Sequence, residues 1–129
     1  MKLARNPYEE TEKESIPKVK LVIMCYEKII ELLEGAEKAI AEKNYEEKSR
    51  LLSKAVDIIT ELICALDFKR GKQIAYGLNN IYLYCLNRII EADRENEPAY
   101  LKEIIPILKD INEAWKEVAK KELEKNRSV

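Results

Sequence analysis

Four stretches of this 129-residue chain carry apolar residues at steps of three and four. On an α-helix these steps place side chains on one stripe, and no stretch alternates with period two for long enough to suggest a strand. The spacing therefore predicts an all-α protein. Four helices of roughly 20 to 27 residues, joined by short connections, favour an antiparallel four-helix bundle. The stripes comprise Val19, Val22, Tyr26, Ile29, Leu33, Ala36 and Ile40; Leu52, Ala55, Ile59, Leu62 and Leu66; Ile74, Leu78, Ile81, Cys85, Ile89 and Ala92; and Leu101, Ile104, Leu108, Ile111, Trp115 and Val118.

Helix-start signals precede the first two stripes. Ser15 as a cap, with Pro17 in the first turn, predicts that the first helix begins there. Asn44 followed by Glu47 resembles a capping box and predicts the start of the second helix.

Glycine and proline mark the later boundaries. The second helix is expected to end near Asp67, and Gly71 is expected to break the chain because glycine tolerates turn conformations. Asn96 and Pro98 predict the start of the fourth helix. Pro106 falls inside that helix and is expected to bend it toward its N-terminal end.

The chain divides into an arm and one domain. Residues 1–15 are charged and lack a sustained apolar stripe, so we predict a mobile N-terminal arm able to dock Tyr8 onto the bundle. Residues 16–125 are predicted to form the bundle domain.

Charge and hydropathy exclude several partners. Lysines and arginines number 23 against 24 acidic residues, so we expect no non-specific attraction to nucleic acid. The chain has neither a secretory signal nor 18 consecutive apolar residues, which predicts a cytoplasmic protein without membrane insertion. The three cysteines are expected to be reduced core thiols; they are Cys25, Cys64 and Cys85.

The sequence lacks the residues that most catalysis needs. It contains no histidine, no Cys-x-x-Cys pair and no glycine-rich phosphate loop. We therefore expect no enzyme activity, cofactor, metal or small-molecule substrate. One enzyme alternative is a bundle that clamps a dicarboxylate with buried arginines, as chorismate mutases do, using Arg50 and Arg88.

The third helix breaks the amphipathic rule. Between Lys72 and Arg88 it carries no charge, and apolar residues point away from its core stripe. A helix that is apolar nearly all round is buried or covered by something. Docking of a partner helix is one explanation, and central burial of this helix or self-association are the alternatives. The residues outside the main stripes are Tyr76, Leu83, Leu86 and Ile90 on the third helix; Leu21, Cys25, Leu32 and Ala39 on the first; and Leu51, Ile58 and Ala65 on the second.

Short motifs along nearly the whole chain resemble the flagellar secretion chaperone family, the flagellin-binding chaperones called FliS. The N-terminal Asn6-Pro7-Tyr8 is similar to the family's opening motif. Residues 17–27 resemble its first-helix segment, with Cys25 replacing a leucine and Glu27 an aspartate. Residues 54–62 with 66–67, and residues 71–84, resemble its second- and third-helix signatures.

The resemblance implies a cytosolic chaperone that binds the disordered C-terminal region of flagellin and prevents premature polymerisation. It also implies delivery to the flagellar type III export apparatus, whose components are further possible partners. The runner-up is a helical adaptor or homodimer that uses the same surface. Tyr82 is either a groove residue or part of the core, and Tyr8 is a candidate to fill the groove when no client is bound. The candidate partner-binding residues are Tyr8, Leu51, Ile58, Tyr76, Tyr82, Leu83, Leu86 and Ile90.

Overall fold

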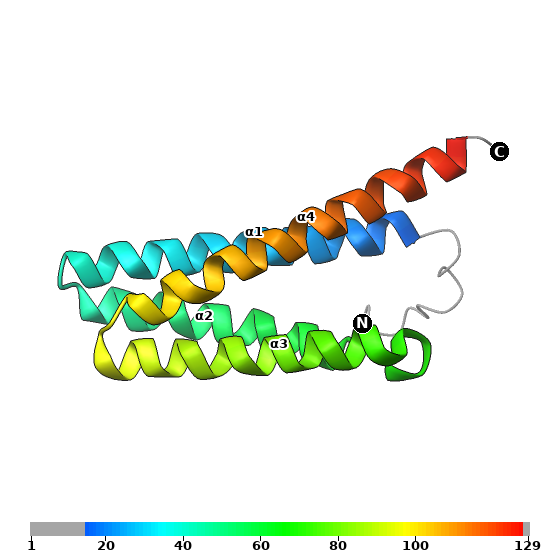
Figure 1. Ribbon diagram of the computed structural model, residues 1–129. Coiled ribbons are helices and arrows are strands. Elements are labelled where there is room, and N and C mark those ends of the chain that lie inside the picture. Colours follow the sequence, from blue (N-terminus) through cyan, green and yellow to red (C-terminus); the bar gives the residue numbers. More distant parts are fainter. Residues whose placement is uncertain (1–14, 128–129) are drawn as a thin grey trace, which may run out of the picture.

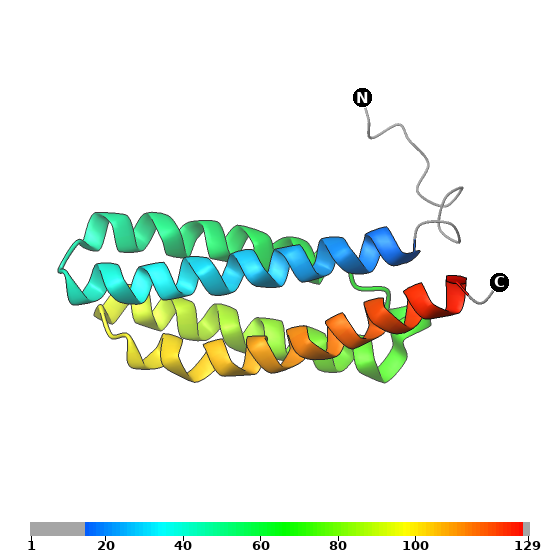
Figure 2. The same ribbon diagram turned by 90° about the horizontal axis from the view of Figure 1, so that it is seen from above.

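The computed structural model describes residues 15–127, which form four antiparallel helices (Figures 1 and 2). Three-residue connections join them, and each helix packs against two others, so that α1 and α3 lie diagonally opposite. No strand occurs within this range, and the predicted all-α four-helix bundle is confirmed. The helices are α1 (Ser15–Ala41), α2 (Tyr45–Cys64), α3 (Phe68–Glu95) and α4 (Ala99–Arg127).

The core takes apolar side chains from all four helices, chiefly at positions of the predicted stripes. Its centre also holds one polar contact, in which the hydroxyl groups of Tyr26 on α1 and Tyr82 on α3 are 2.6 Å apart. Because each hydroxyl is the other's partner, neither is left unsatisfied in an apolar environment. The largest fully buried side chains are Tyr26, Tyr82, Ile29, Leu33, Leu52, Ile59, Ile89, Leu101, Ile104, Leu108 and Cys85.

Of the capping box predicted for the second helix, the structure contains the cap by Asn44 but not the reciprocal bond from the Glu47 side chain. The Asn44 side chain accepts a hydrogen bond from the backbone N–H of Glu47, at 3.2 Å. The Glu47 carboxylate binds Arg50 within α2, at 2.6 Å. The prediction that Asn44 caps α2 is therefore confirmed, while Glu47 serves an ion pair one turn further along.

The third helix begins earlier than predicted. Asp67 caps it, and its carboxylate accepts hydrogen bonds from the backbone N–H groups of Lys69 and Arg70, at 3.1 and 3.0 Å. The helical backbone is interrupted at Lys72, which has φ 46° and ψ −122°. The non-helical conformation was expected at Gly71 and is found instead at the next residue. Gly71 is needed for space instead, because a Cβ there would lie 2.9 Å from the Cβ of Ala75.

Asn96 closes α3 and does not open α4 as predicted. It adopts the left-handed conformation, with φ 54°, and its backbone N–H bonds to the carbonyl of Ala92. Asparagine is one of the few residues that tolerate this conformation at a helix end. The start of α4 is capped by Glu97, whose carboxylate accepts from the N–H of Ala99 at 3.0 Å.

A buried lysine joins α2 to the end of α3. The ammonium of Lys48 lies 2.8 Å from the carboxylate of Asp93 and donates to the Asp93 carbonyl and the Asn96 side chain, at 2.8 and 2.5 Å. A cation at a helix C-terminus is favoured by the carbonyl groups exposed there. Lys48 therefore anchors this end of α3, which the helical pattern alone did not indicate.

Helix α4 stays beside α1 and diverges from α3 toward its carboxyl end (Figure 1). Three ion pairs, whose lysines are seven residues apart on α4, join α4 to α1. They connect Lys102 to Glu37 at 3.4 Å, Lys109 to Glu34 at 3.1 Å, and Lys116 to Glu27 at 3.8 Å. The N-terminal half of α3 is therefore less covered by α4 than its C-terminal half.

The predicted N-terminal arm, residues 1–15, lies outside the described residues except for Ser15, which is the first residue of α1. Among helices α1 to α4, none is long and apolar enough to cross a membrane.

Candidate partner-binding surfaces

The outward side of α3 is an uncharged surface that contains several large apolar side chains. We call it the outer face; its residues follow steps of four and three and are Tyr76, Asn80, Leu83, Asn87 and Ile90. Tyr76, Leu83 and Ile90 are 59%, 50% and 57% exposed. In the part of the chain that the structure describes, these three side chains are therefore left largely uncovered by the other helices. A surface of this kind is a candidate for covering by a partner.

Two other candidate residues of α3 lie deeper. Leu86 is half-buried and packs against the core. Tyr82 is only 2% exposed and pairs with Tyr26. Burial, and then the hydrogen bond to Tyr26, raise the pKa of the Tyr82 hydroxyl. Of the two places that the sequence left open for Tyr82, the groove and the core, the structure therefore shows the core.

The candidate residues of α2 do not join the outer face of α3. Leu51 and Ile58, seven residues apart on one side of α2, are half-buried. A Cβ at Gly35 of α1 would lie 3.1 Å from Leu51 Cδ1, so this side of α2 packs against α1. The side of α2 that meets α3 carries Ser49, whose hydroxyl donates to Asp93 at 2.8 Å. The eighth candidate, Tyr8, lies outside the described residues.

The sequence pattern did not reveal the groove between α2 and α3. A shallow cavity of about 230 Å³ lies there, bordered by Ser53 and Val56 of α2 and by Ile90 of the outer face. Val56 lies outside the core stripe of α2. Its place in the groove could be predicted only by knowing on which side of α2 the third helix packs.

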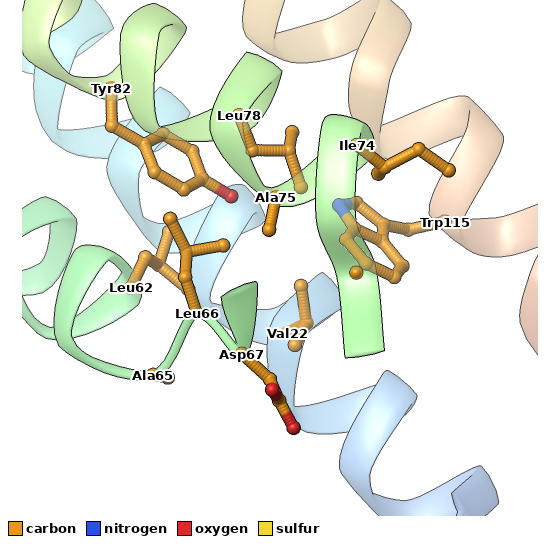
Figure 3. A pocket seen from close by; sticks show the side chains of 11 residues that line it. Val22, Leu62, Ala65, Leu66, Asp67, Ile74, Ala75, Leu78, Tyr82 and Trp115 are labelled. Atoms are coloured by element: carbon orange, nitrogen blue, oxygen red, sulfur yellow. The ribbon is translucent and has the colours of Figure 1, made fainter. Parts of the chain in front are cut away.

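A second cavity opens at the end of the bundle where α4 leaves α3. Its volume is about 240 Å³, and all four helices contribute to its lining, which is apolar except for Asp67, the Tyr82 hydroxyl and the indole N–H of Trp115. Figure 3 shows Ile74 and Trp115 near one another beside this cavity, with Leu78 and Tyr82 further in. We call it the end pocket.

Ile74 corrects a prediction. Its spacing assigned it to the core stripe of the third helix, yet its side chain is 73% exposed. The position faces the side on which α4 would pack, but α4 has diverged at this level and leaves the side chain uncovered. The spacing therefore assigns Ile74 correctly to a side of α3 on which a helix would pack, but α4 does not cover Ile74 at this level.

The two arginines of the enzyme alternative do not form a clamp. Arg50 is exposed and paired with Glu47 within α2. Arg88 lies between two tyrosine rings, with its guanidinium carbon 5.5 Å from the ring centre of Tyr84 and 4.8 Å from that of Tyr100. Such stacking fixes a guanidinium without neutralising it.

Two further predictions concern thiols and metals. Cys85 is buried, and burial raises the pKa of its thiol to about 12, so it stays protonated. Cys25 is half-buried, but Cys64 is exposed near the end of α2, so the prediction of three core thiols is wrong for Cys64. Within residues 15–127, no group of three or more histidine, cysteine or carboxylate side chains could hold a metal ion.

Comparison with known proteins identifies the family. The family described as "Flagellar protein FliS" matches residues 1–122. The chain belongs to the FliS family. It is 30% identical over 116 residues to the flagellar secretion chaperone FliS of Campylobacter jejuni, which covers 90% of this chain and 91% of that protein. It is 33% identical to that of Vibrio cholerae, over 77% of this chain and 73% of the relative. With the Bacillus subtilis chaperone it shares 27% identity, over 92% and 90% of the two chains.

Proposed function

We propose that this FliS family member is a cytosolic export chaperone for flagellin. It binds the disordered C-terminal region of flagellin, prevents premature polymerisation and supports delivery to the flagellar type III export apparatus. The family and the names of the relatives support the chaperone role. The observation that carries the binding proposal is the outer face of α3, where large apolar side chains are half-exposed on a well-formed bundle.

The mechanism is the covering of client surface, without nucleotide or metal. Client side chains that would otherwise pack between subunits of a filament lie against Tyr76, Leu83 and Ile90. Each well-buried aliphatic or aromatic client side chain contributes roughly 1.5–3 kcal/mol. Ordering the client chain offsets much of this gain, so the complex can still release its client.

The experiment is titration of the full chain with a C-terminal fragment of flagellin, followed by calorimetry and size-exclusion chromatography. The wild type is expected to form a discrete one-to-one complex. Leu83→Glu places a charge on the outer face without disturbing the core, because Leu83 is half-exposed. We expect it to weaken binding roughly tenfold or more.

Leu123→Glu is the matched control, since Leu123 is a similarly exposed leucine near the end of α4, away from the outer face. It should bind the fragment as the wild type does. A Leu83→Glu protein that folds and binds with unchanged affinity would show that the outer face is not the client site. A wild type that self-associates and captures no flagellin would support the homodimeric interaction module instead.

A further inference from the structure

One ridge of α3 faces α4 and changes character along its length. Its residues follow steps of three and four and are Ile74, Gly77, Ile81, Tyr84 and Arg88. Near the C-terminal end of α3 the ridge touches α4, because the Tyr84 hydroxyl donates to Glu103 and Arg88 lies over the ring of Tyr100. Toward the N-terminal end of α3 the two helices separate (Figure 1).

Nothing in the fold of residues 15–127 explains the glycine at position 77. It lies inside α3 without a positive φ, and a Cβ built there would meet no heavy atom within 4 Å. Glycine within a helix costs roughly 0.5–1 kcal/mol relative to alanine. Gly71, by contrast, is required by its close approach to Ala75. Neither a turn nor a close neighbour in residues 15–127 therefore requires glycine at position 77.

The residues around Gly77 resemble a helix-packing site, but no helix packs on them within residues 15–127. Ile74 and Ile81 lie one turn before and after it on the same ridge, and Ile74 is 73% exposed. A glycine flanked by two branched side chains forms a notch that admits the backbone of a crossing helix. The nearby end pocket continues this apolar surface between Ile74 and Trp115.

Arg88 lies further along the same ridge, where α3 and α4 still meet, and carries a positive charge. Arg50, Arg70 and Arg94 each pair with a carboxylate on their own helix or its cap. Arg88 has no ion pair among residues 15–127, and its guanidinium donates to the side-chain oxygen of Asn87 on the outer face, at 2.7 Å. The Tyr84 and Tyr100 rings hold this cation in place, and their hydroxyl groups are fixed by Glu103 and Glu95. A fixed, partly exposed guanidinium is suited to a carboxylate.

We propose that an amphipathic helix of the client crosses α3 at Gly77, with a small residue of its own against the glycine, and presents a carboxylate to Arg88. The two points are eleven residues apart on α3, about 16 Å along the axis. A client helix of about three to four turns spans that distance. This inference rests on the proposed function, because it describes how the flagellin segment is held.

The test uses the full chain and the same C-terminal flagellin fragment. Gly77→Leu fills the notch, and because the site is open it leaves the fold of the free protein intact, as circular dichroism and thermal melting will verify. We expect it to weaken binding roughly tenfold or more. Asp57→Leu adds the same side chain on the exposed side of α2 and should leave the affinity unchanged. Ile74→Lys, at an exposed position, is a second way to block the crossing.

Arg88→Gln tests the carboxylate. It should weaken binding roughly tenfold and reduce the salt dependence of the affinity, while Arg88→Lys recovers only part of the loss because lysine lacks the planar fork. Unchanged affinity in both Gly77→Leu and Ile74→Lys, or unchanged affinity and salt dependence in Arg88→Gln, would overturn the inference. If those variants bind normally and Leu83→Glu does not bind the flagellin fragment, the proposed function stands and only the further inference fails. A wild type that does not bind the fragment removes both proposals.

Discussion

Helices α1 and α3 carry similar apolar residues outside their main stripes, yet the structure uses them differently. On α1 the second flank includes Leu32 and Ala39, which are buried, although Leu21 near the N-terminal end is 60% exposed. On α3 the corresponding excess includes Tyr76, Leu83 and Ile90, which are half-exposed. Helix α1 packs closely along both α2 and α4, whereas α3 contacts the same two helices less extensively. The apolar residues outside the main stripe therefore widen the core contact at Leu32 and Ala39 of α1, whereas at Tyr76, Leu83 and Ile90 of α3 they form an uncovered surface.

The largest test of this difference compares two leucine truncations. Leu32→Ala on α1 should lower the free energy of unfolding by about 2–5 kcal/mol, because it removes a buried side chain and leaves a cavity. Leu83→Ala on α3 should change it by no more than about 0.5 kcal/mol. Urea denaturation monitored by circular dichroism measures both. Similar losses at the two positions would mean that the outer face of α3 is covered in solution.

The next test concerns the buried anchor of α3. Lys48→Met should lower the free energy of unfolding by about 1.5–3 kcal/mol, because the acceptors on Asp93 and Asn96 lose a charged donor. Arg50→Met, an exposed cation half a turn along α2, is the matched control and should cost less than about 1 kcal/mol. Equal losses would show that burial adds nothing to the Lys48 contact.

The same contact predicts a dependence on acid. Although burial alone would raise the pKa of Asp93, hydrogen bonds from Lys48 and Ser49 outweigh it and lower that pKa. A folded-state pKa below the unfolded value, about 3.9 for aspartate, means that this stabilisation is present above pH 4 and is lost as the pH falls through the folded-state pKa. Unfolding curves from pH 6 to 2 should therefore show a smaller acid-induced loss in Lys48→Met than in the wild type.

A smaller effect is expected where α1 and α3 meet across the core. Tyr82→Phe removes one hydroxyl and leaves that of Tyr26 buried without its partner, which should cost about 1–2 kcal/mol. Tyr26→Phe should act similarly, and the double variant should lose less than the sum of the two. A double-mutant cycle from chemical denaturation gives the coupling. Strict additivity would indicate that the two hydroxyl groups do not depend on each other.

The smallest effect comes from two glycines. Gly77→Ala in α3 should raise the free energy of unfolding by about 0.5–1 kcal/mol, because alanine favours the helix and the site is open. Gly35→Ala in α1 should gain less, since its Cβ would press on Leu51 Cδ1 at 3.1 Å. Thermal melts of the two variants compare them directly. A larger gain at Gly35 would contradict the looser surroundings inferred for α3.

Several features of the fold could be predicted because they depend on local spacing. The buried side chains Ile29, Leu33, Ile59 and Leu108 lie on predicted stripes, since steps of three and four fix which residues share a helical face. The Asn44 cap was predictable for the same reason, as it bonds within one turn. The roles of Asp67 and Asn96 were not, because both residues can either start or end a helix.

The candidate site was predicted less completely. Tyr76, Leu83 and Ile90 were chosen by helical geometry and lie on the surface, but Leu51 and Ile58 face α1, and Tyr82 is in the core. Which flank of a helix meets which neighbour depends on the direction in which the bundle turns. The spacing along one helix carries no information on that direction.

The sequence by itself determined four helices, their main buried stripes, an excess of apolar residues on the third helix, and the resemblance to the FliS family. Only the tertiary structure decided that α4 follows α1 through three ion pairs and leaves α3 toward its end. That divergence exposes Ile74 and opens the space beside Gly77, whereas Arg88, at the level where α3 and α4 still meet, is held between two tyrosines. The physical reason is that helical periodicity is set by bonds within a helix, whereas the space between two helices is set by the packing of all four.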